Sequence, residues 1–144
     1  MEITKIELLT EQQYLAYKHL ISSACWCWWL STPVSDNDWW LHIVERDGKI
    51  YHANCCQSNV SIRPCCTVSV DSDNPIYWKR RNSLIGTKIK MGQYEWTILD
   101  VISGSLLMLC DSLMGEHGFD LYTNIWEKSE LKRWLETEGI KLLN

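Results

Sequence analysis

A turn sequence, Asp47-Gly48, lies between two strand-like runs. The run Trp39 to Arg46 precedes the turn and the run Lys49 to Ala53 follows it. Aspartate followed by glycine suits the tight turns that join neighbouring antiparallel strands. The pattern therefore predicts a two-residue β-hairpin turn and, with it, a fold that contains antiparallel sheet.

Further short strand-like runs lie on both sides of this hairpin. They cover residues 5–9, 25–30, 60–70, 88–91, 94–101 and 105–110. Pro33 ends the second of these runs, because proline cannot donate to a sheet ladder. One helix is expected to start at Thr10, where Thr10 and Gln13 fit a capping box, and another runs from a cap at Ser129 to Gly139. The pattern predicts an α+β fold of antiparallel sheets with two flanking helices.

The polar stretch Asp71 to Pro75 is the clearest break in the pattern, and we interpret it as a connector. A chain of 144 residues has the usual size of one domain, and its 46% of apolar residues suffice for one core. We therefore predict a single domain, 1–144. It comprises a strand-helix-hairpin half (1–70), a connector (71–83) and a meander with a C-terminal helix (84–144).

The net charge of −4 gives the chain no electrostatic reason to approach a phosphate backbone or an anionic membrane. This balance disfavours direct nucleic-acid binding and membrane association. The first residues lack the basic start and apolar block of a secretory signal, which predicts a cytoplasmic protein. The oligomeric state stays open at this point.

Seven cysteines, an odd count without any C-x-x-C spacing, favour small buried thiols over a disulfide framework. Cys25 and Cys27 would share a strand face, and with His42 or His52 they could bind zinc. A metal- or thiol-dependent enzyme is therefore one alternative. The sequence has no nucleophile elbow, metalloprotease motif or phosphate loop. The favoured interpretation is a non-enzymatic protein without a cofactor.

Two parts of the chain resemble a bacterial and phage family of unknown function. Residues 28–33 (WWLSTP) resemble its W-W-L-R-S-P segment, with Ser31 in place of the arginine, and residues 62–64 (IRP) resemble its V-R-P-A-L strand. Residues 86–100 look like the opening hairpin of that family, and residues 126–135 are similar to its W-E-x-S-x-L-R-x-W-L helix. The halves stand in swapped order. The resemblance implies a C-type-lectin-like fold that is circularly permuted.

The loop and strand after Pro33 carry the side chains for which we expect a binding role. Trp39 and Trp40 are neighbours on a predicted strand, so one is expected to point inward and the other outward. In lectin-like folds the long loops and the strand after them form the usual recognition surface, which the resemblance places in this region. The candidate binding residues are Asp36, Asn37, Asp38, Trp39, Trp40, His42, His52, Asn54, Gln57 and Asn59.

These features favour a binding module whose ligand is another protein, with a phage or mobile-element inhibitor of a host factor as its sharper form. An exposed tryptophan beside polar side chains also suits the stacking of a sugar ring. Carbohydrate binding is therefore the second hypothesis, and the metal- or thiol-dependent enzyme is the third.

Overall fold

The structure is a computed structural model that describes residues 2–35, 37–70 and 81–143. Its elements, in chain order, are β1 (Glu2–Glu7), α1 (Glu11–Tyr17), the 3-10 helix η1 (Lys18–Leu20), β2 (Trp28–Pro33), β3 (Trp40–Val44), β4 (Ile50–Asn54), β5 (Cys65–Ser69), α3 (Arg81–Leu84), β6 (Lys88–Met91), β7 (Tyr94–Ile102), β8 (Ser105–Cys110), the 3-10 helix η2 (Trp126–Lys128), α4 (Glu130–Trp134) and the π-helix η3 (Leu135–Gly139). The predicted connector Asp71 to Pro75 lies outside the described residues.

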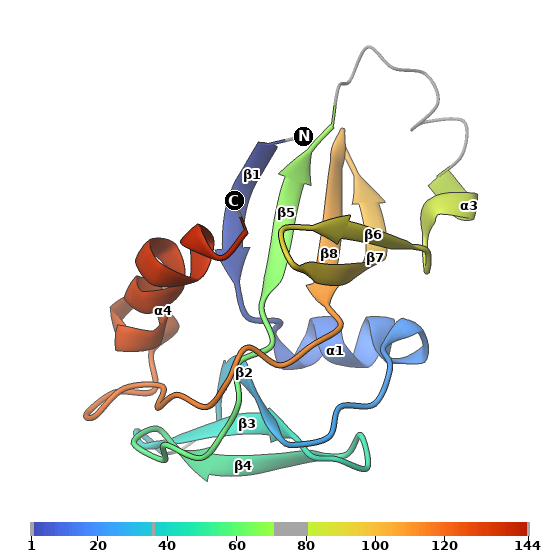
Figure 1. The fold of residues 1–144 in the computed structure, drawn as a ribbon. Helices are drawn as coiled ribbons and strands as arrows, with labels where there is room; N and C mark the ends of the chain where they lie inside the picture. The colour runs from blue at the N-terminus through green and yellow to red at the C-terminus, as the bar shows by residue number, and fades with distance from the viewer. Residues whose placement is uncertain (1, 36, 71–80, 144) are drawn as a thin grey trace.

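The strands form two antiparallel sheets, a larger one of order β1-β5-β8-β7-β6 and a smaller one of order β2-β3-β4 (Figure 1). This confirms the predicted α+β class with antiparallel sheets. In the larger sheet β5 pairs with β8, with Cys65 opposite Leu109 and Ser69 opposite Ser105. Residues before and after the predicted connector therefore share one sheet.

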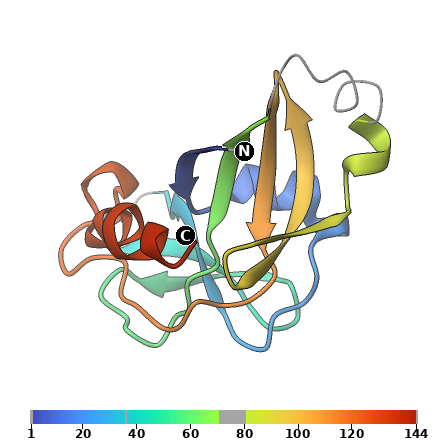
Figure 2. The same cartoon turned by 45° about the horizontal axis from the view of Figure 1, so that its top comes forward.

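The helix α1 lies between the two sheets and closes one of two hydrophobic clusters. In Figure 1 α1 lies below the larger sheet and above the smaller one, whereas α4 stands at the side of β1; in Figure 2 α1 passes behind the larger sheet. Tyr14 of α1 belongs to the same buried cluster as Leu109 of the larger sheet and Val44 of the smaller one. The capping box predicted at Thr10 is present, because its hydroxyl accepts from the Gln13 backbone and the Gln13 side chain accepts in return.

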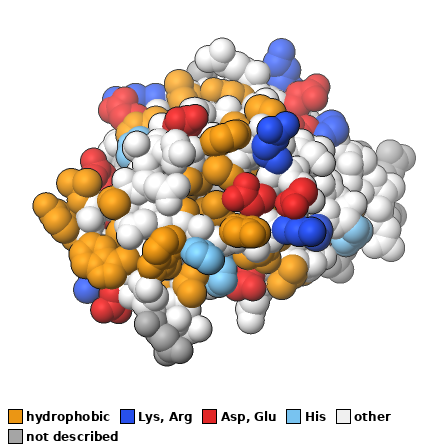
Figure 3. All heavy atoms as spheres, turned by 90° about the horizontal axis from the view of Figure 1, so that it is seen from below, with side chains coloured by type: hydrophobic (Ala, Val, Ile, Leu, Met, Phe, Trp, Pro, Cys, Tyr) orange, Lys and Arg blue, Asp and Glu red, His pale blue; other side chains and the backbone are white. Residues whose placement is uncertain are grey.

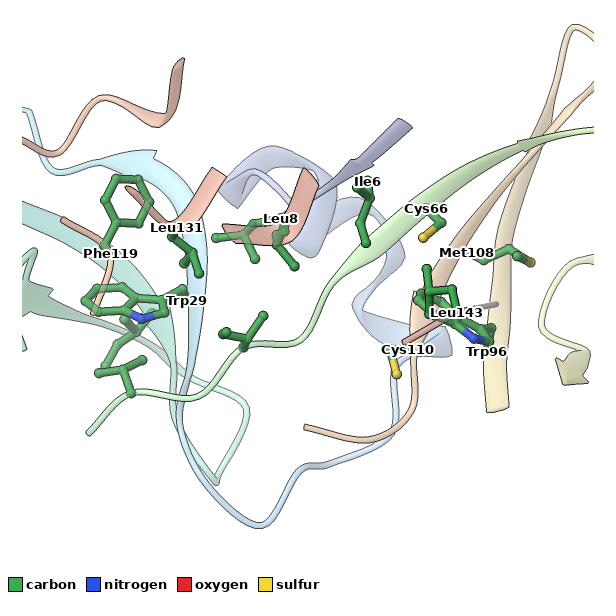
Figure 4. Close-up of a cluster of buried hydrophobic side chains, with 14 of the residues drawn as sticks. Ile6, Leu8, Trp29, Cys66, Trp96, Met108, Cys110, Phe119, Leu131 and Leu143 are labelled. Carbon is green, nitrogen blue, oxygen red and sulfur yellow. The ribbon is translucent and has the colours of Figure 1, made fainter. Parts of the chain in front are cut away.

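The second cluster joins residues that are far apart in the sequence. Trp29 of β2 is fully buried, and its ring centroid lies 5.7 Å from that of Phe119. Figure 4 shows Trp29, Phe119 and Leu131 together at one end of this cluster, with Cys66, Met108 and Trp96 at the other. Burial of side chains from both halves is what fixes the smaller sheet against the larger.

Two local predictions were wrong in detail. The strand expected from Cys25 starts at Trp28, since the Cys27 carbonyl accepts from the Ser61 backbone instead of joining the sheet. The hairpin loop has three residues, 46–48, rather than two. Glu45 N donates to the Lys49 carbonyl, and Gly48 takes the left-handed conformation (φ 83°) that such a three-residue loop requires.

Candidate binding site

The register of β3 and β4 determines which side chains share a face of the smaller sheet. Trp40 lies opposite Asn54, and His42 lies opposite His52, with no bulge between them. Directly opposite residues share a face, and faces alternate along a strand. These four candidate side chains therefore stand on one face, whereas Leu41 is buried on the other.

Contacts on this face hold its side chains in place. The Trp40 ring meets the His52 ring edge-on, with centroids 5.0 Å apart. His42 Nε2 lies 3.2 Å from a carboxylate oxygen of Glu11, at the start of α1. The Glu11 backbone in turn donates to the Thr32 hydroxyl of β2. The carboxylate of Glu11, which was not among the predicted residues, belongs to this face.

Trp39 and Trp40 differ in exposure. Trp39 is 46% exposed, whereas Trp40 is half-buried. The Trp39 backbone donates to Asn37 Oδ1 at 2.8 Å, which closes a tight turn before β3. The neighbouring Asp38 is exposed, and Asp36 lies outside the described residues.

A second loop, residues 120–125, is bound to the first. Asn124 Nδ2 donates to the carbonyl of Asn37 at 2.7 Å and to that of Trp40 at 3.2 Å. The Asp120 carboxylate accepts from the backbone N–H groups of Tyr122, Thr123 and Glu130, and so fixes the loop to the start of α4. Polar side chains on the inside therefore hold a loop whose apolar side chains point outward.

Exposed apolar side chains gather where these two loops meet. We call them the aromatic surface, which consists of Trp39, Leu121, Tyr122 and Ile125. Tyr122 is 78% exposed. In Figure 3, which views the molecule from below, hydrophobic side chains gather toward the left, and histidine side chains lie beside them. The three loop residues were missed by the sequence reasoning, although an apolar pair in a polar loop, Leu121-Tyr122, was the available signal.

The remaining candidates, Asn54, Gln57 and Asn59, bind one another. The Asn54 backbone donates to Gln57 Oε1, and Gln57 Nε2 donates to Asn59 Oδ1. Asn54 Oδ1 accepts from Cys56, and the Asn59 carbonyl accepts from the Trp26 indole at 2.6 Å. These polar groups shape the 54–59 loop, so the site has fewer free hydrogen-bonding side chains than the sequence suggested.

The cysteines divide into buried and exposed groups. Burial raises the pKa of the Cys66 thiol to about 12 and that of Cys110 to about 11, and it raises the pKa of Cys65 well above its ordinary value. Such thiols stay protonated and pack as small apolar groups. Cys25 is exposed while Cys27 is buried, which separates the pair expected to share a face. Within the described ranges, no group of three or more His, Cys, Asp or Glu side chains is placed to hold a metal ion.

A cavity of about 210 Å³ brings a thiol and an imidazole to one place, since Cys56, His117 and Asp120 all line it. His117 Nδ1 lies 2.6 Å from the Gly118 carbonyl, and its ring packs on Trp134. Both oxygens of Asp120 accept backbone N–H groups. In the part of the chain that the structure describes, no carboxylate forms a hydrogen bond that orients His117. The hydrogen bonds of this cluster therefore hold the loop in place.

The fold and the site define an α+β protein with two antiparallel sheets and an exposed aromatic surface at one end. The family described as a domain of unknown function (DUF6273) matches residues 3–70. That span runs from β1 through β5, and it contains β3 and β4 with the histidine-bearing face. No curated protein matches the chain, and no solved structure matches it. Among the described helices, none combines the length and apolar character needed to cross a membrane.

Proposed function

We propose that this chain is a non-enzymatic module that binds another protein through the aromatic surface. The observation that carries the proposal is the exposure of large apolar side chains on two loops that are hydrogen-bonded to each other. Removing apolar area from water is favourable by about 25 cal/mol per Å². Gathered exposed apolar side chains are therefore a recurring mark of interfaces.

The anchoring of the loops favours tight binding. Asn124 and Asp120 hold the backbone on which Trp39 and Tyr122 stand. Binding then orders few additional groups, which lowers its entropic cost. Tyrosine and tryptophan are also the residues in which interfaces concentrate their binding energy.

The sharper form of the proposal is a phage or mobile-element protein that inhibits a host factor by occluding a basic cleft. The net charge of −4 supports it, because negative charge speeds the approach to a positively charged surface. Asp38 adds an exposed carboxylate beside Trp39.

Pull-down from a lysate of the source cells tests protein binding. We expect a specific partner that is retained by the wild-type chain and lost with Trp39→Ala or Tyr122→Ala. Ile102→Ala is the matched control, because Ile102 is an exposed apolar residue at the end of β7, away from the smaller sheet (Figure 1). Recovery of no specific partner, or equal recovery with all three variants, contradicts the proposal.

Carbohydrate binding is the second candidate, and the exposed Trp39 next to Asn37 and Asp38 favours it. A sugar ring could stack on the indole while the neighbouring side chains bind its hydroxyl groups. A glycan array separates the two functions: protein binding predicts no glycan signal, whereas a signal that Trp39→Ala abolishes supports carbohydrate binding.

For the fold, we propose a circularly permuted C-type-lectin-like arrangement. The family match covers the first half, and the motifs in the second half resemble the opening of the family whose W-W-L-R-S-P segment the first half resembles. The pairing of β5 with β8 supports the proposal, because each half supplies one of these strands. The two halves therefore share a sheet whichever half comes first in the sequence. Both described ends of the chain lie near β1 (Figures 1 and 2).

A rearranged chain tests this permutation. It is opened between Asn74 and Pro75, and its former ends are joined by a short glycine-serine linker. We expect the same circular dichroism spectrum and a free energy of unfolding within about 1 kcal/mol of the wild type, because the length of a closing loop has a small effect. A rearranged chain that fails to fold contradicts the proposal.

A further inference from the structure

We propose that two copies of this chain pair through the free edge of β4, in an antiparallel arrangement centred on Tyr51. The inference goes beyond the proposed function, because it concerns the assembly of the chain with itself. Two-fold dimers are the commonest homo-oligomers, and in them the same surface of each copy is buried. The β4 edge has the backbone pattern that a two-fold pairing requires.

The hydrogen bonds of the β3–β4 hairpin establish which groups of β4 face outward. Cys55 N donates to the Trp39 carbonyl at 2.7 Å, and Glu45 N donates to the Lys49 carbonyl at 2.9 Å. In an antiparallel pair, hydrogen-bonded and non-hydrogen-bonded positions alternate. Every second residue between these two bonds therefore directs its backbone groups toward β3.

The residues of β4 divide accordingly. Tyr51 and Ala53 bond to β3. The backbone groups of Ile50, His52 and Asn54 point to the free edge. No hydrogen bond among the described residues uses the outward groups of Ile50 and His52. This edge therefore offers two donors and two acceptors, which are placed symmetrically on either side of Tyr51.

A second β4 strand placed antiparallel about Tyr51 uses every one of these groups. Tyr51 then lies opposite its own counterpart, and Ile50 of each copy lies opposite His52 of the other. Because the facing groups point toward each other, each of these two Ile50–His52 pairs exchanges two N–H···O=C hydrogen bonds. Both donors and both acceptors of each copy are then satisfied.

The neighbouring two-fold registers use fewer groups. Centred on His52, the pairing would set Ile50 against Asn54. The N–H and the carbonyl of Asn54 are already bonded to Gln57. Centred on Ile50, the pairing would set His52 against Gly48, whose N–H and carbonyl are also used within the chain. The free groups of β4 therefore favour the register about Tyr51.

The side chains at this edge also suit a second copy. Tyr51 is 58% exposed, and the pairing sets the two Tyr51 side chains directly opposite each other. Facing aromatic side chains stabilise antiparallel strands. Lys49, which precedes β4, would lie opposite Ala53 of the other copy. The pairing therefore sets no like charges against each other.

Self-pairing also needs little ordering of the chain. A segment of another protein could form no more backbone hydrogen bonds with Ile50 and His52 than the second copy does. A flexible segment would have to be ordered when it binds, whereas β3 already holds β4 as a strand. These points favour a second copy as the occupant of the edge.

The other edge of the smaller sheet is already covered. Ser31 N donates to the Leu9 carbonyl at 2.9 Å, and Trp29 N donates to the Ser61 carbonyl at 3.1 Å. Pro33, at the end of β2, has no N–H to offer. A second copy therefore finds no comparable row of free groups along β2.

The edges of the larger sheet carry features that hinder pairing. At one edge, β6 places Lys88 and Lys90 on its short strand. At the other, β1 has an irregular register between Ile3 and Lys5. Lysines and bulges are common protections of edge strands. β4 lacks them, since it contains no lysine or proline and its register against β3 is continuous.

The dimer would join the two smaller sheets into one sheet, with β2, β3 and β4 from each copy. About five residues of each copy would pair, far fewer than the roughly 20 to 30 on each side of a standard interface. We therefore expect a weak dimer, with a dissociation constant on the order of 0.1 mM. It would present two aromatic surfaces, which raises the avidity for a multivalent partner.

Disulfide trapping tests the register. Tyr51→Cys is prepared in a chain that also carries Cys25→Ser and Cys56→Ser, which remove the exposed natural thiols. In the proposed pairing, the Cα atoms of residue 51 in the two copies lie about 4.5 Å apart, within the span of a disulfide. We expect air oxidation at a chain concentration of about 0.1 mM to give a covalent dimer that reducing agent dissociates.

Lys49→Cys in the same background is the matched control, because residue 49 is also exposed and lies on the same face of the strand. The pairing places it about 13 Å along the strand from its counterpart, too far for a disulfide. We expect this variant to stay monomeric under reducing and oxidising conditions alike. Equal cross-linking of the two variants, or none with Tyr51→Cys, overturns the inference.

Sedimentation of the chain from about 5 µM to about 1 mM measures the dimer without cross-linking. His52→Pro removes one outward N–H from each copy, and so two hydrogen bonds from the dimer, without breaking a bond to β3. His52→Ala keeps that N–H. We expect dimerisation to weaken roughly tenfold or more with proline and only a few-fold with alanine. Equal dimerisation of the two variants contradicts pairing through this edge.

Hydrogen exchange of the wild-type chain gives a readout that does not depend on a variant folding. Between the dilute and the concentrated chain, the amides of Ile50 and His52 should gain protection, whereas those of Tyr51 and Ala53 are protected in both. A chain that stays monomeric at about 1 mM, or gains no protection at Ile50 and His52, overturns the inference. Either result would leave the edge to a segment of another protein, and protein binding through the aromatic surface would still stand.

Discussion

Replacing Arg63 with alanine is expected to lower the free energy of unfolding by about 3 to 5 kcal/mol. Arg63 is 1% exposed, and its guanidinium donates to the carbonyls of Cys110 at 2.7 Å and Ser22 at 2.9 Å. It also stacks over the Trp28 ring at 5.1 Å. Alanine would leave the buried Cys110 carbonyl without this donor, remove the partly buried bond to the Ser22 carbonyl, and open space beside the indole.

Chemical denaturation checks this prediction, with Arg63→Lys and Arg133→Ala as comparisons. Lysine keeps the charge but lacks the planar fork that reaches several acceptors, so we expect an intermediate loss. Arg133 is exposed, and its removal should change the free energy of unfolding by less than about 0.5 kcal/mol. An Arg63→Ala variant as stable as the wild type would show that this contact does not hold β5 and β8 to the segment after α1.

Trp29→Ala should lower the free energy of unfolding by a similar amount, about 3 to 5 kcal/mol. Its ring is fully buried, packs on Phe119, and donates through Nε1 to the His117 carbonyl at 2.7 Å. The substitution removes a contact between β2 and the segment after β8. These two segments lie far apart in the sequence. The cavity and the unpaired carbonyl both add to the loss.

The matched control is Trp39→Ala, because Trp39 is the same residue type directly before the neighbouring strand β3 but is 46% exposed. We expect that variant to stay within about 1 kcal/mol of the wild type. Thermal and urea unfolding of both variants make the comparison. Equal losses for Trp29 and Trp39 would contradict the assignment of Trp29 to the core and Trp39 to the surface.

Elements defined by local chemistry were predictable from the sequence. The bounds of β6 and β8 match the predicted runs, because turn residues flank each of them. The caps at Thr10 and Ser129 were also predicted, since capping depends on neighbouring residues. The start of β2 was not predicted correctly, because the Cys27 carbonyl accepts from the Ser61 backbone, a contact that no local sequence pattern reveals.

The candidate site was predictable in part for the same reason. Alternation along a strand predicted one inward and one outward tryptophan, but Trp39 lies before β3 and neither ring is buried: Trp39 is exposed and Trp40 is half-buried. The bond from Asn124 that joins the loop of Tyr122 to the loop of Trp39 links positions far apart in the chain, so it could be found only in the structure. Gln57 looked free in the sequence but is used inside its own loop, where short-range hydrogen bonds compete with ligand binding.

Site-specific photo-crosslinking in the source cells tests most directly whether the aromatic surface binds a protein. A photoreactive phenylalanine derivative replaces Tyr122, the most exposed member of that surface, and in a second chain it replaces Ile102 near the opposite end of the molecule. Binding through the aromatic surface predicts one discrete cross-linked protein with the first chain and none with the second. Absence of a cross-link at Tyr122, or the same pattern from both positions, would show that the aromatic surface does not bind a protein.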